Sequence, residues 1–365
     1  MAMKKTGSCQ FGMSNNNSDH FILVFHGAEV FDTGDASTFI RLLNPEKSIV
    51  AGVMARTAAG ESGLEVIYDG RRPSEILSQY GAHEAVLVHR AKNSVSAHRF
   101  GSIIHSHLEE RGLIFIEPGT GQILVYGSVE MSCIRWLKEK TGYIIVNGER
   151  HKDNPPGMRR IGGCLPGEPV FVNGIIIGHA TNEEVVISLQ DGAIEAVSGI
   201  LIKEHGIEKL MRSGCPDIQK AWCKSGHIRL SFPKKGDNQR KRGKIAVIDH
   251  KAMACYDCFG FDICGILAIG DDTTSICGHI GCSRGIPVLG ITDGDIDGIV
   301  PEGYAPGSVV LLAVNERDDE LGREIVKMVP EYQVIWNEWV HEIISKLGDR
   351  VRIVHHEYGF IQNEQ

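Results

Sequence analysis

The stretch Gly265–Asp295, GILAIGDDTTSICGHIGCSRGIPVLGITDGD, decides the fold of the last third of the chain. Its two apolar runs, GILAIG and IPVLGIT, have the length of buried strands, and the segment between them has the composition of a helix. A strand, a helix and a second strand in this order predict a βαβ unit with two parallel strands. We therefore expect both apolar runs to end at the same edge of one sheet.

The same alternation of strands and helices continues outward from this stretch. KIAVID predicts a strand before it, and SVVLLAV and RVRIVHHEY predict strands after it. Near the N-terminus, FILVF, EAVLVH and LIFIE alternate with helical patterns in the same way. We therefore predict an α/β protein with two mostly parallel-sheet α/β units, an N-terminal one at residues 21–155 and a C-terminal one at residues 244–365.

A small β-rich module is expected between the two units. The segment VFVNGIIIGHATNEEVVISLQDGAIEAVSG contains short β-rich runs separated by Asn-Gly and Asp-Gly, which are strong hairpin signals. A polar, basic stretch that ends near Gly243 follows this segment. We assign residues 156–243 to this module and a linker, and residues 1–20, which contain no apolar run, to a disordered tail.

Size and composition narrow the class of protein. A chain of 365 residues exceeds the usual single domain of about 100–200 residues, so two or three domains are expected. The formal net charge of -8 argues against nucleic acid as a partner. Because no apolar run approaches the roughly 20 residues of a membrane span, we expect a cytoplasmic protein without a membrane partner; a homo-oligomer is compatible with the sequence.

Two clusters of aspartate follow the apolar runs of the quoted stretch. If the two strands are parallel neighbours, Asp271, Asp272, Asp293 and Asp295 approach one another although they share a charge sign. Unpaired like charges at one edge cost stability unless a cation or a substrate compensates them. Carboxylate oxygens suit Mg²⁺ or Mn²⁺, so the sequence predicts a magnesium site at this edge.

Phosphate-binding groups are expected beside this metal. Thr273, Thr274 and Ser275 open the helix that follows the first cluster, and hydroxyls together with free backbone N–H groups at a helix start bind anions. In the first unit, Arg56 and Lys92 follow two predicted strands and carry the opposite charge. The combination predicts a small anionic or phosphorylated ligand held between the two units.

His26, in FHGAEVFDTG, lies just beyond the first predicted strand and is the candidate general base. A hydrogen-bonded structural histidine is the more common role for such a residue. The aspartates also have an interpretation without function, in which Asp272 caps the helix and the later aspartates form a surface turn.

Cysteine offers a competing metal site. The segment CYDCFGFDIC places Cys255, Cys258 and Cys264 close together, and thiolate pairs separated by two residues are common ligands of zinc and iron–sulfur clusters. A second such pair is missing, and buried free cysteines explain the pattern equally well. Zinc or an iron–sulfur cluster is therefore the alternative cofactor.

The acidic segment NERDDELG follows the predicted strand SVVLLAV. Asp318 and Asp319 border the same edge in one interpretation of this segment. The interpretation that we favour is a helix N-terminus, where acidic residues interact well with the helix dipole.

The stretches FHGAEVFDTG, GDDTTSICGHIGCSRGIPVLGITDGDID and NERDDELG together resemble an uncharacterised archaeal family, mainly of methanogens, catalogued as domain of unknown function 2117. The resemblance spans most of the chain. It implies an archaeal cytoplasmic protein whose cysteines stay reduced, and it implies no activity, ligand or mechanism.

The residues favour a Mg²⁺-dependent enzyme that handles a nucleotide or a phosphorylated metabolite at the aspartate-rich edge. Phosphoryl or nucleotidyl transfer and hydrolysis are the reactions that this chemistry suits. Two alternatives remain open: a cysteine-ligated metal protein that serves cofactor assembly, and a non-catalytic binding or assembly protein whose acidic edge docks a basic partner.

Overall fold

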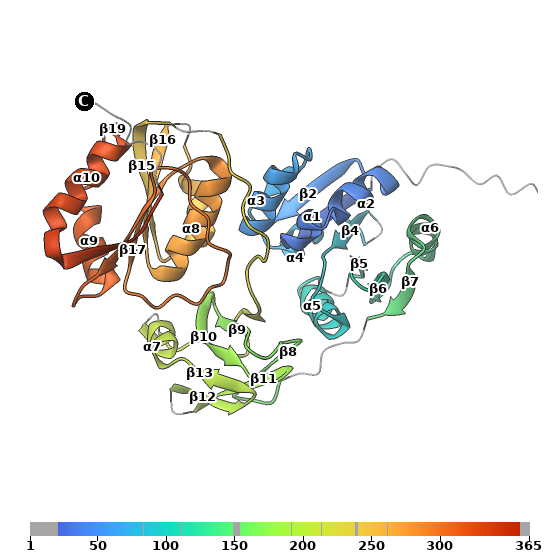
Figure 1. The fold of residues 1–365 in the computed structure, drawn as a ribbon. Helices are drawn as coiled ribbons and strands as arrows, with labels where there is room; N and C mark the ends of the chain where they lie inside the picture. The colour runs from blue at the N-terminus through green and yellow to red at the C-terminus, as the bar shows by residue number, and fades with distance from the viewer. Residues whose placement is uncertain are drawn as a thin grey trace, which may run out of the picture.

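The computed structural model describes residues 21–82, 84–109, 111–148, 154–190, 192–212, 214–237, 240–260 and 262–357. The predicted tail at residues 1–20 lies outside these ranges. The mixed α/β fold is confirmed. In Figure 1 the N-terminal α/β unit is blue to blue-green, the β-rich module is green, and the C-terminal α/β unit is yellow to red. No helix in the described ranges is long and apolar enough to cross a membrane.

The N-terminal unit is built on a sheet with the strand order β3-β2-β1-β4-β5-β6-β7. The first five strands of this order are parallel, and β6 runs antiparallel to β5. Helices cover both faces, which explains the continuous apolar runs of the central strands. The strands are β1 (Ile22–His26), β2 (Lys47–Ala51), β3 (Ile67–Asp69), β4 (Ala85–Val88), β5 (Leu113–Glu117), β6 (Gln122–Tyr126) and β7 (Ile144–Asn147); the helices are α1 (Glu29–Asp32), α2 (Asp35–Leu43), α3 (Val53–Ser62), α4 (Pro73–Leu77), α5 (Ser94–Ser106) and α6 (Met131–Thr141).

The module consists of two small antiparallel sheets, with orders β13-β10-β9-β14 and β12-β11-β8. Asn173 and Gly174 both have positive φ angles, 51° and 85°, as a two-residue hairpin turn between β9 and β10 requires. The Asn-Gly signal in the sequence is thereby explained. The elements are β8 (Met158–Gly162), β9 (Pro169–Val172), β10 (Ile175–Ala180), β11 (Glu184–Gln190), β12 (Ala193–Ser198), β13 (Ile200–Ile202), α7 (Glu204–Arg212) and β14 (Cys223–Ser225).

The C-terminal unit has the sheet order β19-β15-β16-β17-β18-β20. Its four central strands are parallel and follow one another in chain order, and the two edge strands are antiparallel to their neighbours. Helix α8 covers one face, and α9 and α10 cover the other (Figure 1). The elements are β15 (Arg242–Asp249), η1 (Ala252–Cys258), β16 (Ile263–Ile269), α8 (Asp271–Arg284), β17 (Val288–Thr292), β18 (Val309–Ala313), α9 (Asp318–Val326), β19 (Val334–Ile335), α10 (Trp336–Leu347), η2 (Gly348–Arg350) and β20 (Val351–His356).

The quoted stretch forms the predicted βαβ unit. Strands β16 and β17 are parallel neighbours, joined by α8. The pattern of KAMACYDCFGFD, after β15, predicts a helix, and within it Ala252–Cys258 form the short 3-10 helix η1.

Arg229 joins the N-terminal and C-terminal units. Its side chain, only 2% exposed, donates hydrogen bonds to Asp32 of α1 at 2.9 Å and to Glu61 of α3 at 2.6 Å. The same guanidinium lies 3.1 Å from the Nε2 atom of His279 in α8. Because charges buried at this depth are costly without partners, this network holds the two units in one arrangement.

Candidate functional site

The carboxyl ends of the four parallel strands of the C-terminal sheet bring acidic side chains together. Asp271 begins α8 directly after β16 and Gly270, Asp293 follows β17, and Asp318 begins α9 after β18. His250 follows β15, the next strand of the sheet. Parallel strands end at one edge, so residues that are nearly 70 positions apart in the chain become neighbours.

Three carboxylates form the centre of this edge. Asp271, Asp293 and Asp318 each offer one oxygen, and these atoms lie within 4.8 Å of one another. Asp271 and Asp318 are both 6% exposed, while Asp293 is half-buried. The three side chains have the spacing from which a single cation could be held.

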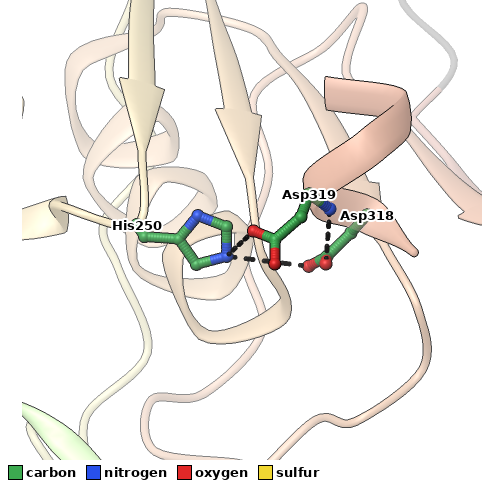
Figure 2. Close-up of side chains that lie close together, drawn as sticks. All are labelled: His250, Asp318 and Asp319. Atoms are coloured by element: carbon green, nitrogen blue, oxygen red, sulfur yellow. Dashed lines mark hydrogen bonds and ion pairs between the residues drawn. The ribbon is translucent and has the colours of Figure 1, made fainter. Parts of the chain in front are cut away.

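His250 and Asp319 extend the group through Asp318, as Figure 2 shows. The Nε2 atom of His250 lies 3.4 Å from Asp319 and 3.9 Å from Asp318, and it is buried without a hydrogen-bond partner among the described residues. The Nδ1 atom of the same ring lies 2.5 Å from Asp249. His250 therefore presents an unsatisfied ring nitrogen to the carboxylates.

Backbone geometry fixes the positions of these side chains. Both carboxylate oxygens of Asp271 accept backbone N–H bonds, from Asp293 at 3.2 Å and from Gly294 at 3.1 Å. Asp318 accepts one from the N–H of Asp319 at 2.7 Å. Between β16 and α8 the chain turns at Gly270, where φ is 102° and an added Cβ would lie 3.0 Å from the His250 ring. Only glycine fits this turn without moving the histidine.

The electrostatics of the group disfavour three charged carboxylates. Burial raises the pKa of Asp271 to about 7, and the charges of Asp293 and Asp318 add to the increase. Burial, followed by the charge of Asp293, also raises the pKa of Asp318. A bound cation would reverse these effects, because it favours the charged form of each carboxyl group.

Comparison with known proteins places the chain in a family. The model of a family described as "Uncharacterized protein conserved in archaea (DUF2117)" matches residues 23–333. The chain belongs to the DUF2117 family. It is also 32% identical, over 329 residues, to the uncharacterized protein MJ0065 of Methanocaldococcus jannaschii, and the match covers 84% of this chain and 90% of that protein. No solved structure matches the chain.

The four aspartates that the sequence suggests for the metal are divided between two groups in this DUF2117 chain. Asp271 and Asp293 belong to the three-carboxylate centre, with Asp318 as the third member. Asp295 instead forms an ion pair of 2.8 Å with Lys203 of the module. The pKa of Asp272 is raised to about 6 by burial and by the nearby charge of Asp297, and the module residue Lys203 lowers it in part. Asp272 and Asp295 thus face the module.

The three hydroxyl residues that the sequence suggests for phosphate binding, at the start of α8, are buried. The Thr274 hydroxyl donates a hydrogen bond of 3.4 Å to the carbonyl of Ala268, and its methyl group occupies the space where a Cβ on Gly290 would lie. Thr273 and Ser275 are each 6% exposed. Their side chains have little surface to offer a phosphate, so an anion at this helix would meet mainly backbone N–H groups.

The predicted anion-binding residues of the first unit lie elsewhere. Arg56 stacks over the ring of Tyr256 of η1, 4.2 Å from its centroid. Lys92 forms an ion pair of 2.6 Å with Glu168 of the module. Within the described ranges, both side chains therefore contact other protein groups and do not point to the three-carboxylate centre.

His26 ends β1 at the carboxyl edge of the first sheet. Its ring centroid lies 5.2 Å from those of both His89 and Phe100, and it stacks on Phe100. Burial lowers its pKa to about 3, and the neighbouring charges of His89 and Lys224 act in the same direction. His26 is thus a neutral imidazole in a different part of the molecule from the aspartates.

The cysteines of the alternative site do not converge. The sulfur atoms of Cys255 and Cys277 of α8 are 4.0 Å apart. Cys258 is exposed. Cys264 lies in β16, and its sulfur is near the carbonyl of Val334. Within the described residues, neither group with metal-binding geometry contains a cysteine.

Sequence reasoning missed His250 and gave Asp318 a different role. The signal for both was present, since each follows a predicted strand, KIAVID or SVVLLAV, in the same way as the aspartates of the quoted stretch. A search for polar residues after every parallel strand would have found the whole group.

Proposed function

We propose that this protein is a Mg²⁺-dependent enzyme that acts on a nucleotide or a phosphorylated metabolite at the carboxyl edge of β16, β17 and β18. The observation that carries the proposal is the convergence of Asp271, Asp293 and Asp318, whose ligand atoms lie within 4.8 Å of one another. This edge is also where ligands bind in open parallel sheets.

The chemistry of the donor groups supports the choice of metal. Asp271, Asp293 and Asp318 would hold the ion, and all three supply hard oxygen atoms, which suit Mg²⁺ and Mn²⁺. Mg²⁺ usually keeps positions for water and substrate phosphates, and when bound it stabilises charge on phosphoryl oxygens. A phosphorylated substrate is therefore the class that fits this donor set.

Two features of the chain supply the remaining parts of such a site. The N-terminus of α8, a helix of 14 residues, lies at the same edge and favours a negatively charged group through its backbone N–H groups. His250, whose Nε2 atom has no hydrogen-bond partner in the described structure, can hold or accept a proton beside the carboxylates. We assign His250, rather than His26, the role of proton carrier in the proposed reaction.

The test is thermal unfolding of the purified protein with EDTA, Mg²⁺, Mn²⁺, ATP, GTP and each metal–nucleotide pair. Ligands that bind only the folded protein raise its melting temperature, so we expect Mg²⁺ to stabilise the protein and a nucleotide to add to the effect. Asp271→Asn removes a charge from the centre and is expected to abolish the Mg²⁺ shift. Asp295→Asn, a change of the same kind at the same edge, leaves the three carboxylates intact and is expected to retain it.

The outcomes separate the proposed function from its alternatives. A shift with metal alone that no nucleotide increases would retain the metal site and remove the proposed substrate class. The absence of any metal shift would contradict the proposal and favour a protein whose acidic edge binds a basic partner. Loss of the Mg²⁺ shift in both Asp271→Asn and Asp295→Asn would show that the ion does not bind at the three-carboxylate centre as proposed.

A further inference from the structure

We propose that the protein has a second ligand site, at which the ammonium group of Lys224 binds a small oxyanion, the phosphate or carboxylate group of a metabolite. The site lies where β14 of the module faces the carboxyl ends of β1 and β4 in the N-terminal sheet. It involves none of the residues of the three-carboxylate centre and does not depend on the function proposed for that centre.

The strand order of the first sheet marks this edge as a place where ligands bind in open parallel sheets. In the order β3-β2-β1-β4-β5, the chain moves outward in one direction from β1 to β3 and in the other from β4 to β5, so the reversal lies between β1 and β4. Ligands of open parallel sheets bind outside the carboxyl ends of the strands at such a reversal. Gly27 follows β1 with a φ of 84°, and an added Cβ there would lie 2.8 Å from the Nδ1 atom of His89.

The module contacts this edge of the first sheet through Lys92. The Nζ atom of Lys92, which follows β4, donates hydrogen bonds to the hydroxyl of Ser225 in β14 at 3.0 Å and to Glu168 at 2.6 Å. Lys224, the residue before Ser225, is therefore held beside the strand ends. The titratable groups that face its ammonium come from the first unit and the module: His26, Glu29, His89, Lys92 and Glu168.

Lys224 lacks the partner that the neighbouring cations have. Lys92 is paired with Glu168, and Arg90 is paired with Asp35 at 2.6 Å. In the described residues, no hydrogen bond or ion pair of the Lys224 ammonium is present, and this group lies 4.9 Å from the centroid of the Phe171 ring. The Phe171 ring attracts the cation, but a half-buried ammonium without a paired anion still has a desolvation cost. Charges left unbalanced in this way are often found at binding sites.

Two further groups support an anion as the occupant. In the part of the chain that the structure describes, the Nδ1 atom of His26 is buried without a hydrogen-bond partner, so a polar atom remains available at the end of β1. Among the described residues, Glu29 is the facing carboxyl group that is not paired with a cation, and burial raises its pKa, which disfavours its charged form. A bound oxyanion would supply the missing negative charge.

The test is isothermal titration calorimetry with inorganic phosphate and, in a separate arm, acetate, both in EDTA so that no metal ion contributes. We expect the wild-type protein to bind at least one of them, Lys224→Met to bind at least 10-fold more weakly, and Lys224→Arg to retain binding. Lys220→Met is the matched control, because Lys220 lies in the same module but is 87% exposed in its side chain. Stronger binding in one arm identifies the oxyanion as phosphate or carboxylate.

Proton uptake distinguishes direct binding from an indirect effect on folding. Burial lowers the pKa of Lys224 to about 8, so at pH 8 about half of its amines are neutral, and an anion that pairs with the ammonium must draw protons from the buffer. We expect the heat of binding at pH 8 to depend on the ionisation enthalpy of the buffer in the wild type and to lose this dependence in Lys224→Met.

Three results would overturn the site: no binding of phosphate or acetate to the wild type, equal binding by Lys224→Met, or equal loss in Lys220→Met. Asp271→Asn is expected to bind the oxyanion like the wild type. If it does, the two proposals are independent: a negative Mg²⁺ result does not contradict the oxyanion site, and a negative oxyanion result does not contradict the metal centre.

Discussion

Asp318→Asn tests the three-carboxylate centre through an unusual expectation: removing an acidic residue should stabilise the metal-free protein. A carboxylate oxygen of Asp318 lies within 4.8 Å of an oxygen of Asp271 and of Asp293. Asp318 is 6% exposed. Asparagine has the same shape and keeps an oxygen that can accept the N–H of Asp319, which lies 2.7 Å from the carboxylate. The substitution therefore removes like-charge repulsion while keeping the local hydrogen bond.

The magnitude follows from the distance. Two unit charges separated by 4.8 Å repel each other by about 3 kcal/mol at an effective dielectric constant of about 20. Solvent at the half-exposed edge weakens this repulsion, so we expect Asp318→Asn to raise the free energy of unfolding in EDTA at pH 8 by about 1–3 kcal/mol. In Mg²⁺ the order reverses, since the wild type gains binding energy that the variant lacks.

The assay is urea denaturation followed by tryptophan fluorescence. Trp336 and Trp339, two of the four tryptophans, belong to α10, are buried in the core of the C-terminal unit and report on its folding. Because burial raises the folded-state pKa of Asp271 to about 7 and also raises that of Asp318, the wild type loses stability as pH rises from about 4 to about 7. The advantage of Asp318→Asn is therefore expected at pH 8 and is expected to shrink at pH 5.

A structural role for Asp318 predicts the opposite result. If its main function were an ion pair with His250, from which it lies 3.9 Å away, Asp318→Asn would destabilise the metal-free protein and most strongly at low pH. That result, or an equal Mg²⁺ shift in wild type and variant, would refute the charge argument. Asp349→Asn, at an exposed position in the same unit, is the control and should change neither quantity.

Two other predictions concern the interior of the protein. Arg229→Met should lower the free energy of unfolding by about 3–5 kcal/mol, because it leaves the carboxylates of Asp32 and Glu61 without their buried partner. The triple variant that also carries Asp32→Asn and Glu61→Gln should recover much of this loss. The same urea titration measures both effects. The purified protein should contain no stoichiometric zinc or iron by elemental analysis, because the Cys277 thiol, whose pKa its contact with Cys255 and burial both raise, is a poor metal ligand; one metal per chain that is lost in Cys255→Ser would support the cysteine site instead.

The sequence was most informative about local structure. Apolar runs bounded by glycine and aspartate predicted the strands on both sides of α8, and the Asn-Gly pair predicted the turn between β9 and β10. These features depend on neighbours in the chain, so a local pattern is sufficient to predict them. The extent of η1 was harder to predict, because the helical pattern of KAMACYDCFGFD does not show that the helix is of the 3-10 type and ends at Cys258.

The candidate site could be predicted only in part. The sequence indicated that Asp271 and Asp293 would meet, since each follows one of two parallel strands joined by a helix. It could not distinguish Asp271 from Asp272, because successive residues of a helix point about 100° apart and nothing local shows which direction faces the carboxylates. Asp272 faces the charges of Lys203 and Asp297, which come from the module and from the loop after β17.

By itself, the sequence determined the alternation of strands and helices, the hairpins of the module and the presence of aspartates after two strands, because periodicity and turn chemistry are local properties. The tertiary structure decided which charges become neighbours. Strand order brought His250 and Asp318 to the edge with Asp271. Packing of the module left Lys224 facing the first sheet without an ion pair to any described acidic residue. Such contacts join residues far apart in the chain, and their energies depend on burial, which only the folded protein sets.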